Sequence, residues 1–428
     1  MRQKFNQIIY DIRRQPLIGT VTIIATALSI FLFMVVAITE RVKVVPFSPE
    51  SCRDNLLMGK YLHLQKTDET GSDMSSGLSY YTAKKLYENL DGVERESFME
   101  PDLSATLVKG TTQKSFSAYS RGVDAEFFRI FDHSLISGTF FTDAESDANM
   151  PVVVISESTA RKAFNSIDCV GMPIIIQHKK YIVRGVVKDS SRLACSACGD
   201  IFIAKGYHNK KEDVFSSLSD YFGGIAVALL VKDDSDFEHI RQQVIARYKE
   251  LDTELATDNW KSVYHEAPFN QEILASDNFG SNWSPDLSQQ NRVRNLLYGI
   301  LLILPAINLS TLLHSRMRKR MNEIGIRRAF GCSRPRIIAD IITENFLFTL
   351  AGGIIGLALG IIFAITYSGL YENMETAGQN ITPAIGAVIN AGTILIALAV
   401  CFILNLISAF VPAWQASRLN PVEAINAK

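Results

Sequence analysis

Long apolar runs occur at four places along the chain and predict four membrane-spanning helices. The first run, residues 17–39, contains no charged residue and is long enough to cross a hydrocarbon core of about 30 Å. Three further runs lie in the last third of the chain, at 295–313, 346–370 and 387–411. A cleaved signal peptide is the alternative for the first run, but its length and the charged residues that follow it favour an uncleaved span.

The segment between the first two spans, residues 40–292, has the pattern of an ordinary water-soluble domain. Strand-like stretches occur at 151–158 and 181–188, helix-like stretches occur at 81–89 and 236–251, and Gly/Ser/Asn/Asp-rich loops separate them. The sequence therefore predicts an α-helical membrane protein with four transmembrane helices and an α+β extracytoplasmic domain inserted between helices 1 and 2.

The distribution of basic residues predicts how the chain is oriented across the membrane. They are frequent in residues 1–16 and in the loop 314–345, whereas the loop between the third and fourth spans contains no Lys or Arg. By the positive-inside rule, the basic loop, the N-terminal segment and the tail 412–428 are cytoplasmic, and the large domain is extracytoplasmic.

Composition and motifs exclude several classes of protein. A formal net charge of −1, from 43 basic and 44 acidic residues, does not indicate a nucleic-acid partner. The sequence contains no G-x-x-x-x-G-K-[ST], H-E-x-x-H or G-x-S-x-G motif. The spans carry no ionisable residue at mid-membrane, which disfavours an ion-driven carrier. We therefore expect no catalytic residue, no metal site and no cofactor bound by this chain.

Four of the six cysteines, Cys52, Cys169, Cys195 and Cys198, fall in the outer domain. The Cys195-Ser-Ala-Cys198 segment is compatible with a redox dithiol, a zinc half-site or a disulfide. Too few further metal ligands lie nearby for zinc, and no thioredoxin-like βαβ pattern surrounds the pair. A structural disulfide across the pair, or with Cys52 and Cys169, is the favoured interpretation in an oxidising compartment.

Small residues mark one face of the third span. Gly352, Gly356 and Gly360 recur every four residues, which removes side chains from one side of a helix and lets another backbone approach closely. The pattern predicts a helix-packing face, and it leaves open whether the partner helix belongs to this chain or to another.

The basic loop is predicted to be a helix, a turn and a second helix. Helix-forming residues at 317–330 end at Gly331, and Ser333 followed by Pro335 is typical of a new helix start. Binding of the basic residues to membrane lipid headgroups is the simplest role for such a loop.

Three segments resemble one family. EIGIRRAFG (323–331) closely resembles the cytoplasmic loop of the FtsX-like and MacB-like ABC transporter permeases, and the tail PAWQASRLNPVEAINAK (412–428) is similar to the closing pattern of that family. The outer segment 137–189 resembles the periplasmic core domain of MacB-type permeases. The resemblance covers nearly the whole chain.

This resemblance implies a homodimer or heterodimer of permeases docked on two cytoplasmic ABC ATPase subunits. Proteins of the MacB type carry the ATPase ahead of the first span, where this sequence has only residues 1–16, so we expect a separate ATPase that binds the ATP and Mg²⁺. The residues implied in ATPase coupling are those of the loop motif: Glu323, Ile324, Gly325, Ile326, Arg327, Arg328, Phe330 and Gly331. Within this motif, Glu323 and Arg327 have the spacing of an intrahelical ion pair.

The implied activity is mechanotransmission, in which ATP hydrolysis moves the periplasmic domain of a multi-pass permease in the bacterial inner membrane. The size of the outer domain favours extrusion of peptides, toxins or small amphiphiles from the periplasm, with a periplasmic adaptor and an outer-membrane channel as further partners. Two alternatives stay open: an FtsX-like regulatory transducer that controls an envelope hydrolase or signalling partner, and a lipoprotein-release permease.

Overall fold

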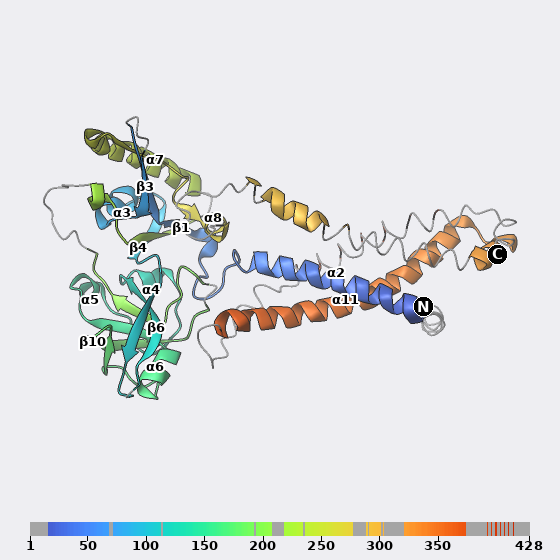
Figure 1. Ribbon diagram of the computed structural model, residues 1–428, viewed down its shortest axis with the longest axis horizontal. Helices are drawn as coiled ribbons and strands as arrows, with labels where there is room; N and C mark the ends of the chain where they lie inside the picture. Colours follow the sequence, from blue (N-terminus) through green and yellow to red (C-terminus); the bar gives the residue numbers. More distant parts are fainter. Residues whose placement is uncertain are drawn as a thin grey trace. The chain divides into compact units, whose positions relative to one another are not determined.

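The structure is a computed structural model that describes most of the outer domain and part of the membrane region. The described residues are 16–67, 72–112, 114–191, 194–207, 218–233, 236–276, 288–289, 291–300 and 321–373, with single positions at 303, 392, 395, 399, 403, 406, 410 and 414. The chain divides into two compact units (Figure 1). One unit comprises Val42–Leu287 and Gly369–Ala384, and the other comprises Met1–Arg41, Ser288–Ser368 and Ile385–Lys428.

A mixed sheet forms the frame of the outer unit. Among the described residues it has eleven strands, in the order β11-β8-β10-β9-β5-β6-β4-β12-β1-β14, with β7 paired to β10. The strands are β1 (Leu56–Gly59), β4 (Val93–Met99), β5 (Ser104–Lys109), β6 (Phe116–Val123), β7 (Leu135–Gly138), β8 (Val152–Ser156), β9 (Pro173–Ile176), β10 (Lys179–Val187), β11 (Ile201–Ala204), β12 (Ala226–Val231) and β14 (Phe269–Asn270). Parallel pairs β10–β8 and β11–β6 lie beside antiparallel ones, as an α+β domain allows.

A smaller sheet and several helices complete the unit. The smaller sheet is β13 (Trp260–Ser262), β2 (Tyr61–Lys66) and β3 (Asp73–Gly77), in that order. The helices are α3 (Tyr80–Tyr87), α4 (Phe127–Ile130), α5 (Asp143–Asp147), α6 (Glu157–Phe164), α7 (Phe237–Leu255) and α8 (Gln271–Ser276), with short 3₁₀ turns η1 (Arg53–Asn55), η2 (Leu218–Tyr221) and η4 (Ala256–Asp258).

Local sequence explains several of these elements. The first four residues of β8 are apolar and β-branched, and all five of its positions are buried, as expected for a strand covered on both faces. Ser156 ends that strand and caps α6, because its side chain accepts a hydrogen bond from the Thr159 N–H. The predicted strands at 151–158 and 181–188 are confirmed as β8 and β10, and the predicted helices at 81–89 and 236–251 are confirmed as α3 and α7.

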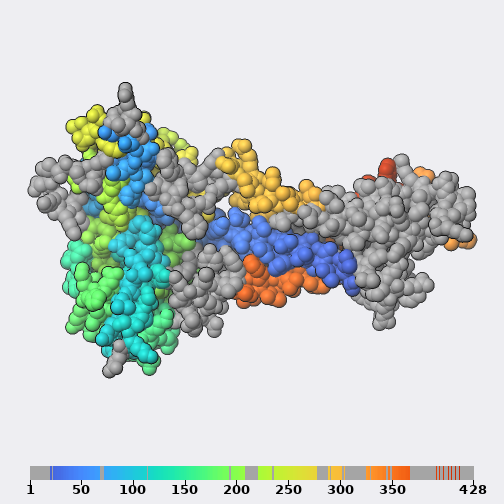
Figure 2. All heavy atoms as spheres, viewed as in Figure 1, coloured from blue at the N-terminus to red at the C-terminus, as the bar shows by residue number. Residues whose placement is uncertain are grey.

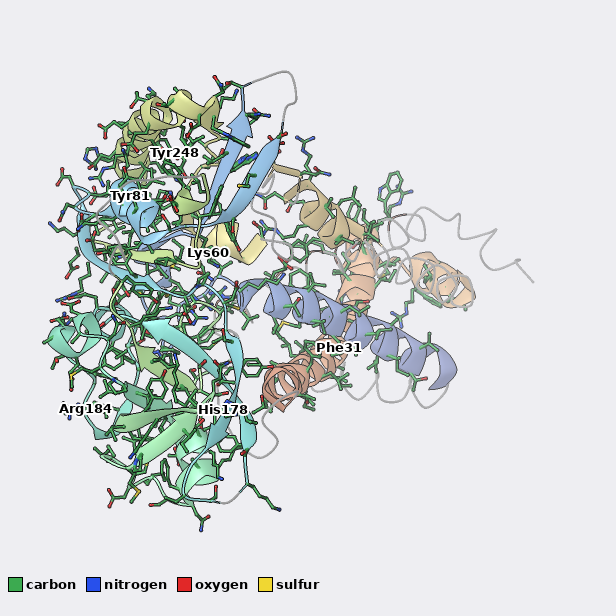
Figure 3. The ribbon with its side chains drawn as sticks, turned by 60° about the vertical axis from the view of Figure 1, so that its left-hand side comes forward. Phe31, Lys60, Tyr81, His178, Arg184 and Tyr248 are labelled. Carbon is green, nitrogen blue, oxygen red and sulfur yellow. The ribbon has the colours of Figure 1, made fainter. Side chains whose placement is uncertain are left out.

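The core of the outer unit consists of three large hydrophobic clusters of described residues. The first packs α3 and α7 against β2 and β12, with Leu86, Leu229 and Val244 fully buried. Figure 3 shows Tyr81 and Tyr248, from α3 and α7, in this region. The second cluster surrounds α4 and contains several phenylalanines, and the third lies under α6 and includes Cys169.

The membrane unit contains three named helices among the described residues. They are α2 (Pro16–Arg41), α10 (Met321–Ala329) and α11 (Arg334–Asn373). Two stretches, Ile23–Arg41 and Thr349–Thr366, are long and apolar enough to cross a membrane. Most of the predicted spans 295–313 and 387–411, and the tail 412–428, lie outside the described residues, so the four-span arrangement stays a prediction.

Candidate functional site

The basic loop folds into a helical hairpin with a glycine turn. α10 ends where Gly331 adopts a φ of +87°, a left-handed conformation that side chains disfavour. The Cys332 N–H then donates to the Arg327 carbonyl at 3.0 Å, and the Phe330 N–H donates to the Ile326 carbonyl at 3.1 Å. These contacts close the helix in the manner of a Schellman cap and reverse the chain.

The second helix of the hairpin begins directly after this turn. The Ser333 carbonyl accepts hydrogen bonds from the N–H groups of Arg336 at 3.1 Å and Ile337 at 3.2 Å. Pro335 lies in the first turn, where no intrahelical partner is needed for its nitrogen. The predicted helix–turn–helix is thus confirmed from Met321 onward, and α11 continues as one helix of 40 residues.

A small hydrophobic cluster holds α10 on α11. Ile324 is buried against Ile337 and Ile341, and Cys332 and Ile338 pack at its edge. Ile324, one of the residues implied in ATPase coupling, therefore does not lie on the surface of the hairpin, because the hairpin itself covers this side chain. The neighbouring Gly325 is buried as well.

The opposite face of α10 presents apolar and basic side chains. Ile326 is 49% exposed and Phe330 is 89% exposed, and Arg327 is exposed between them. Full burial of a phenylalanine or isoleucine contributes about 2 kcal/mol, so this face is a good candidate for protein docking. The side chains of Glu323 and Arg328 lie outside the described residues, and the predicted Glu323–Arg327 pair stays a prediction.

The glycine face of α11 lies against α2 of the same chain. A Cβ built on Gly356 would lie 2.6 Å from the Ala27 carbonyl oxygen. A Cβ on Gly352 or Gly360 would meet the Cβ atom of Thr26 at 2.8 Å or of Met34 at 2.9 Å. Only residues without a side chain permit this approach. Figures 1 and 2 show the two helices side by side.

Other α2 residues complete this helix–helix contact. The buried positions recur every three or four residues: Thr26, Ala27, Ile30, Met34 and Ile38. Phe31, labelled in Figure 3, meets Phe363 edge to face at a centroid distance of 6.1 Å. The sequence analysis did not identify these partners, although the small Thr26 and Ala27 in an apolar run were a usable signal.

Cys52 and Cys169, two of the four outer-domain cysteines, are free thiols in this structure. Cys52 packs against the second hydrophobic cluster and Cys169 lies within the third, which keeps them in different parts of the core. Burial raises the pKa of Cys52 to about 12 and that of Cys169 to about 11, so both are poor nucleophiles at neutral pH. The Cys198 Sγ lies 4.0 Å from the Cys195 carbonyl oxygen, and a disulfide between these two residues stays a prediction.

Within the part of the chain that the structure describes, no group of three or more His, Cys, Asp or Glu residues is arranged to hold a metal ion.

Together, the apolar helices, the basic hairpin and the large α+β domain define a membrane permease with a periplasmic domain. Residues 18–247 match the family described as MacB-like periplasmic core domain, and residues 295–421 match the family described as FtsX-like permease C-terminal. The chain belongs to the MacB-like and FtsX-like permeases of ABC transporters.

Individual relatives are about a quarter identical to this chain over the aligned residues. "Pyoverdine export ATP-binding/permease protein PvdT" of Pseudomonas savastanoi pv. phaseolicola is 24% identical over 319 residues, which cover 73% of this chain and 43% of that protein. "Macrolide export ATP-binding/permease protein MacB" of Nitrobacter winogradskyi is 24% identical over 305 residues, covering 70% and 42%. The chain thus spans less than half the length of these relatives.

Among solved structures, the periplasmic region of MacB from Actinobacillus actinomycetemcomitans matches 52% of this chain and 94% of its own, with 16% identity and a TM-score of 0.33.

Proposed function

We propose that this chain is the permease subunit of an ABC exporter and couples ATP hydrolysis by a separate ATPase to movement of its periplasmic domain. The observation that carries this proposal is the continuity of α11. This helix starts inside the cytoplasmic hairpin and runs without interruption into the apolar stretch Thr349–Thr366. A displacement of the hairpin is therefore a displacement of the span.

The exposed face of α10 supports docking on an ATPase. Phe330 and Ile326 offer an apolar anchor, and the Arg327 guanidinium suits carboxylates on the partner surface. The partner would bind the ATP and Mg²⁺, since the printed sequence contains no phosphate-binding loop of the G-x-x-x-x-G-K-[ST] type.

Two contacts pass the movement onward inside the membrane unit. The Ile324 cluster fixes α10 to α11, and the glycine face fixes α11 to α2. α2 then continues at Val42 into the outer domain. Packed helices move as rigid bodies, so a shift of the hairpin reaches the start of the outer domain.

The names of the relatives support the proposal that movement of the periplasmic domain drives export. They describe export of pyoverdine and of macrolides by those proteins. By extension, the cargo here is a peptide, a toxin or a small amphiphile in the periplasm. A homodimer or heterodimer in the bacterial inner membrane, with cytoplasmic termini, would act together with a periplasmic adaptor and an outer-membrane channel.

The experiment is co-purification of the tagged full-length chain in mild detergent, with the recovered ATPase quantified by mass spectrometry. Phe330→Ala should reduce ATPase recovery at least tenfold, because an exposed aromatic anchor of this kind contributes about 2 kcal/mol. Ile354→Ala is the control, since Ile354 is an exposed apolar residue of α11 beyond the hairpin. Equal ATPase recovery with Phe330→Ala and wild type would contradict the docking role of α10.

A further inference from the structure

A buried ion pair ties the segment that follows α2 to the outer domain. Glu50 and Arg53 are each only 1% exposed, and the Arg53 Nε donates to the Glu50 Oε2 at 2.6 Å. Charged side chains are rarely buried this completely unless all their polar atoms have partners.

Arg53 holds the backbone that leads out of α2. Its terminal nitrogen Nη1 donates to the Val42 carbonyl and to the Val45 carbonyl, both at 3.0 Å. Its guanidinium also lies 4.2 Å from the centroid of the Phe47 ring. One side chain thereby fixes three points of a segment that would otherwise be an ordinary loop.

Glu50 connects this segment to the sheet. Its Oε1 accepts hydrogen bonds from the N–H groups of Ser196 at 2.7 Å and Ala197 at 2.8 Å. The same turn is bound from the sheet side by Arg121 of β6, a buried residue that donates to the Cys195 carbonyl at 2.9 Å and to the Ser196 carbonyl. The ion pair is therefore anchored to β6, a strand inside the sheet.

The segment that leaves the outer domain is joined at the same place. Gln271, the first residue of α8, donates through its side-chain nitrogen to the Lys43 carbonyl at 2.7 Å. Directly before it, β14 pairs with β1, with Asn270 opposite Leu57. In the sequence, α8 precedes the predicted second span at 295–313. The start of α8 is thus bound to residues 42–45, which directly follow α2.

We propose that Glu50, Arg53 and Gln271 form a joint that passes movement of α2 to the outer domain and to the segment leading to the second span. This inference rests on the proposed function. A flexible loop after α2 would absorb the movement of the helix, whereas directional hydrogen bonds to the carbonyls of Val42, Lys43 and Val45 oblige the domain to follow. Apolar side chains of similar size can match a buried ion pair in stability, but they cannot fix the direction of a backbone segment. The three residues are positioning residues.

The test compares movement of the outer domain with the rate of ATP hydrolysis. Both are measured in the complex of the full chain and its ATPase, reconstituted in lipid vesicles. Spin labels are placed at Lys249→Cys, an exposed position of α7, in both permeases of the dimer, with the native cysteines replaced by serine. Pulsed EPR then gives the distance change caused by ATP with vanadate.

Two variants weaken the joint while keeping side-chain size. Arg53→Lys retains the charge but cannot reach Glu50 and both carbonyls at once, and Gln271→Leu removes only the donor to Lys43. Arg161→Lys is the matched control, because the exposed Arg161 side chain pairs with Glu157 on α6. We expect both joint variants to lose at least half of the distance change while ATP hydrolysis stays within twofold of wild type, and we expect the control to behave as wild type.

Hydrogen exchange separates a joint from a purely structural role. Amide exchange in β8 and β12 should be unchanged in Gln271→Leu, since the hydrogen bond that is lost goes to Lys43 and not to either strand. Raised exchange there together with lost movement would contradict the proposal. A full distance change in both joint variants would overturn the joint alone. Absence of any distance change in wild type during ATP hydrolysis would instead overturn the proposed function, and the joint with it.

Discussion

The contact between α2 and α11 and the start of the outer domain hold the chain by opposite means. At the helix contact, Gly352, Gly356 and Gly360 contribute no side chain, and the backbones come together directly. At the start of the outer domain, Glu50 and Arg53 contribute long charged side chains that are almost completely buried. One contact depends on shape alone, and the other depends on charge and hydrogen bonding.

The difference follows from the solvent of each region. Lipid tails are as apolar as leucine, so burial of apolar surface adds little between helices in a membrane, and close packing must supply the attraction. The outer domain folds in water, where a buried charge is retained only with complete pairing. We conclude that added side-chain volume should weaken the contact between α2 and α11, and that loss of a buried charge should destabilise the outer domain.

Removing a charge from the joint should cause the largest loss of unfolding free energy. Glu50→Ala leaves the buried Arg53 without its carboxylate, which costs about 3–5 kcal/mol in unfolding free energy. The exposed pair of Glu157 and Arg161 is the comparison, and Glu157→Ala should cost less than about 1 kcal/mol. Denaturant unfolding of the full chain in detergent measures both values, and equal losses would contradict the distinction.

One buried histidine should contribute a loss of stability to the outer domain as the pH falls. His133 packs among the rings of Phe127, Phe128 and Phe202, and burial lowers its pKa from 6.5 to about 4. The unfolded chain takes up this proton near pH 6.5 and the folded chain only near pH 4. The stability present above pH 6.5 is therefore lost as pH falls towards 4, by about 3 kcal/mol for this group.

His133→Phe removes the titrating group, so the melting temperature of the wild type should fall relative to that of the variant between pH 6.5 and 4. An identical pH profile in wild type and variant would show that His133 does not carry the effect. The contact between α2 and α11 should not respond to this change of pH, because its buried residues carry no ionisable group.

Added side-chain volume at the contact between α2 and α11 should weaken that contact by a moderate amount. In Gly356→Ala the new methyl would lie 2.6 Å from the Ala27 carbonyl oxygen, and overpacking of this kind costs about 1–3 kcal/mol. Gly299→Ala is the control, since nothing lies within 4 Å of a Cβ at that helical position. The Phe31→Cys/Phe363→Cys cross-link should form severalfold more slowly with Gly356→Ala and at the normal rate with Gly299→Ala, and the reverse order would refute the packing argument.

The smallest effect on stability is expected at the docking face. Phe330 is 89% exposed, so Phe330→Ala should change the melting temperature of the chain by an amount equivalent to less than about 0.5 kcal/mol. Thermal unfolding in detergent checks this value. A large loss of stability would place Phe330 in the internal packing of the hairpin instead of on a docking surface.

The sequence predicted the elements that depend on local pattern. The turn at Gly331, the helix start at Ser333 and the strands β8 and β10 each follow from a few neighbouring residues. The glycine spacing likewise predicted a packing face on α11. Its partner could not be predicted, because helix pairing in a membrane depends on which of several apolar helices fits.

Tertiary contacts explain what the sequence did not reveal. Ile324 has the character of a presented apolar residue, but the return of α11 covers it with Ile337 and Ile341. Glu50 and Arg53 look like ordinary loop charges in the sequence. They become buried partners only because the turn at Ser196 and Ala197, well over a hundred residues later, supplies two N–H groups.

The most direct test of the account is a break in α11 between the hairpin and the glycine face. Thr343→Pro interrupts the helix in this region, because proline removes a backbone hydrogen bond and clashes with the preceding turn, whereas Thr343→Ala leaves the helix intact. The measurement is the ATP-dependent EPR distance change between outer domains labelled at Lys249→Cys, with the Phe31→Cys/Phe363→Cys cross-link tested separately for intact packing. We predict that Thr343→Pro retains the cross-link and ATP hydrolysis but loses the distance change. A distance change equal to that of Thr343→Ala would contradict transmission through α11.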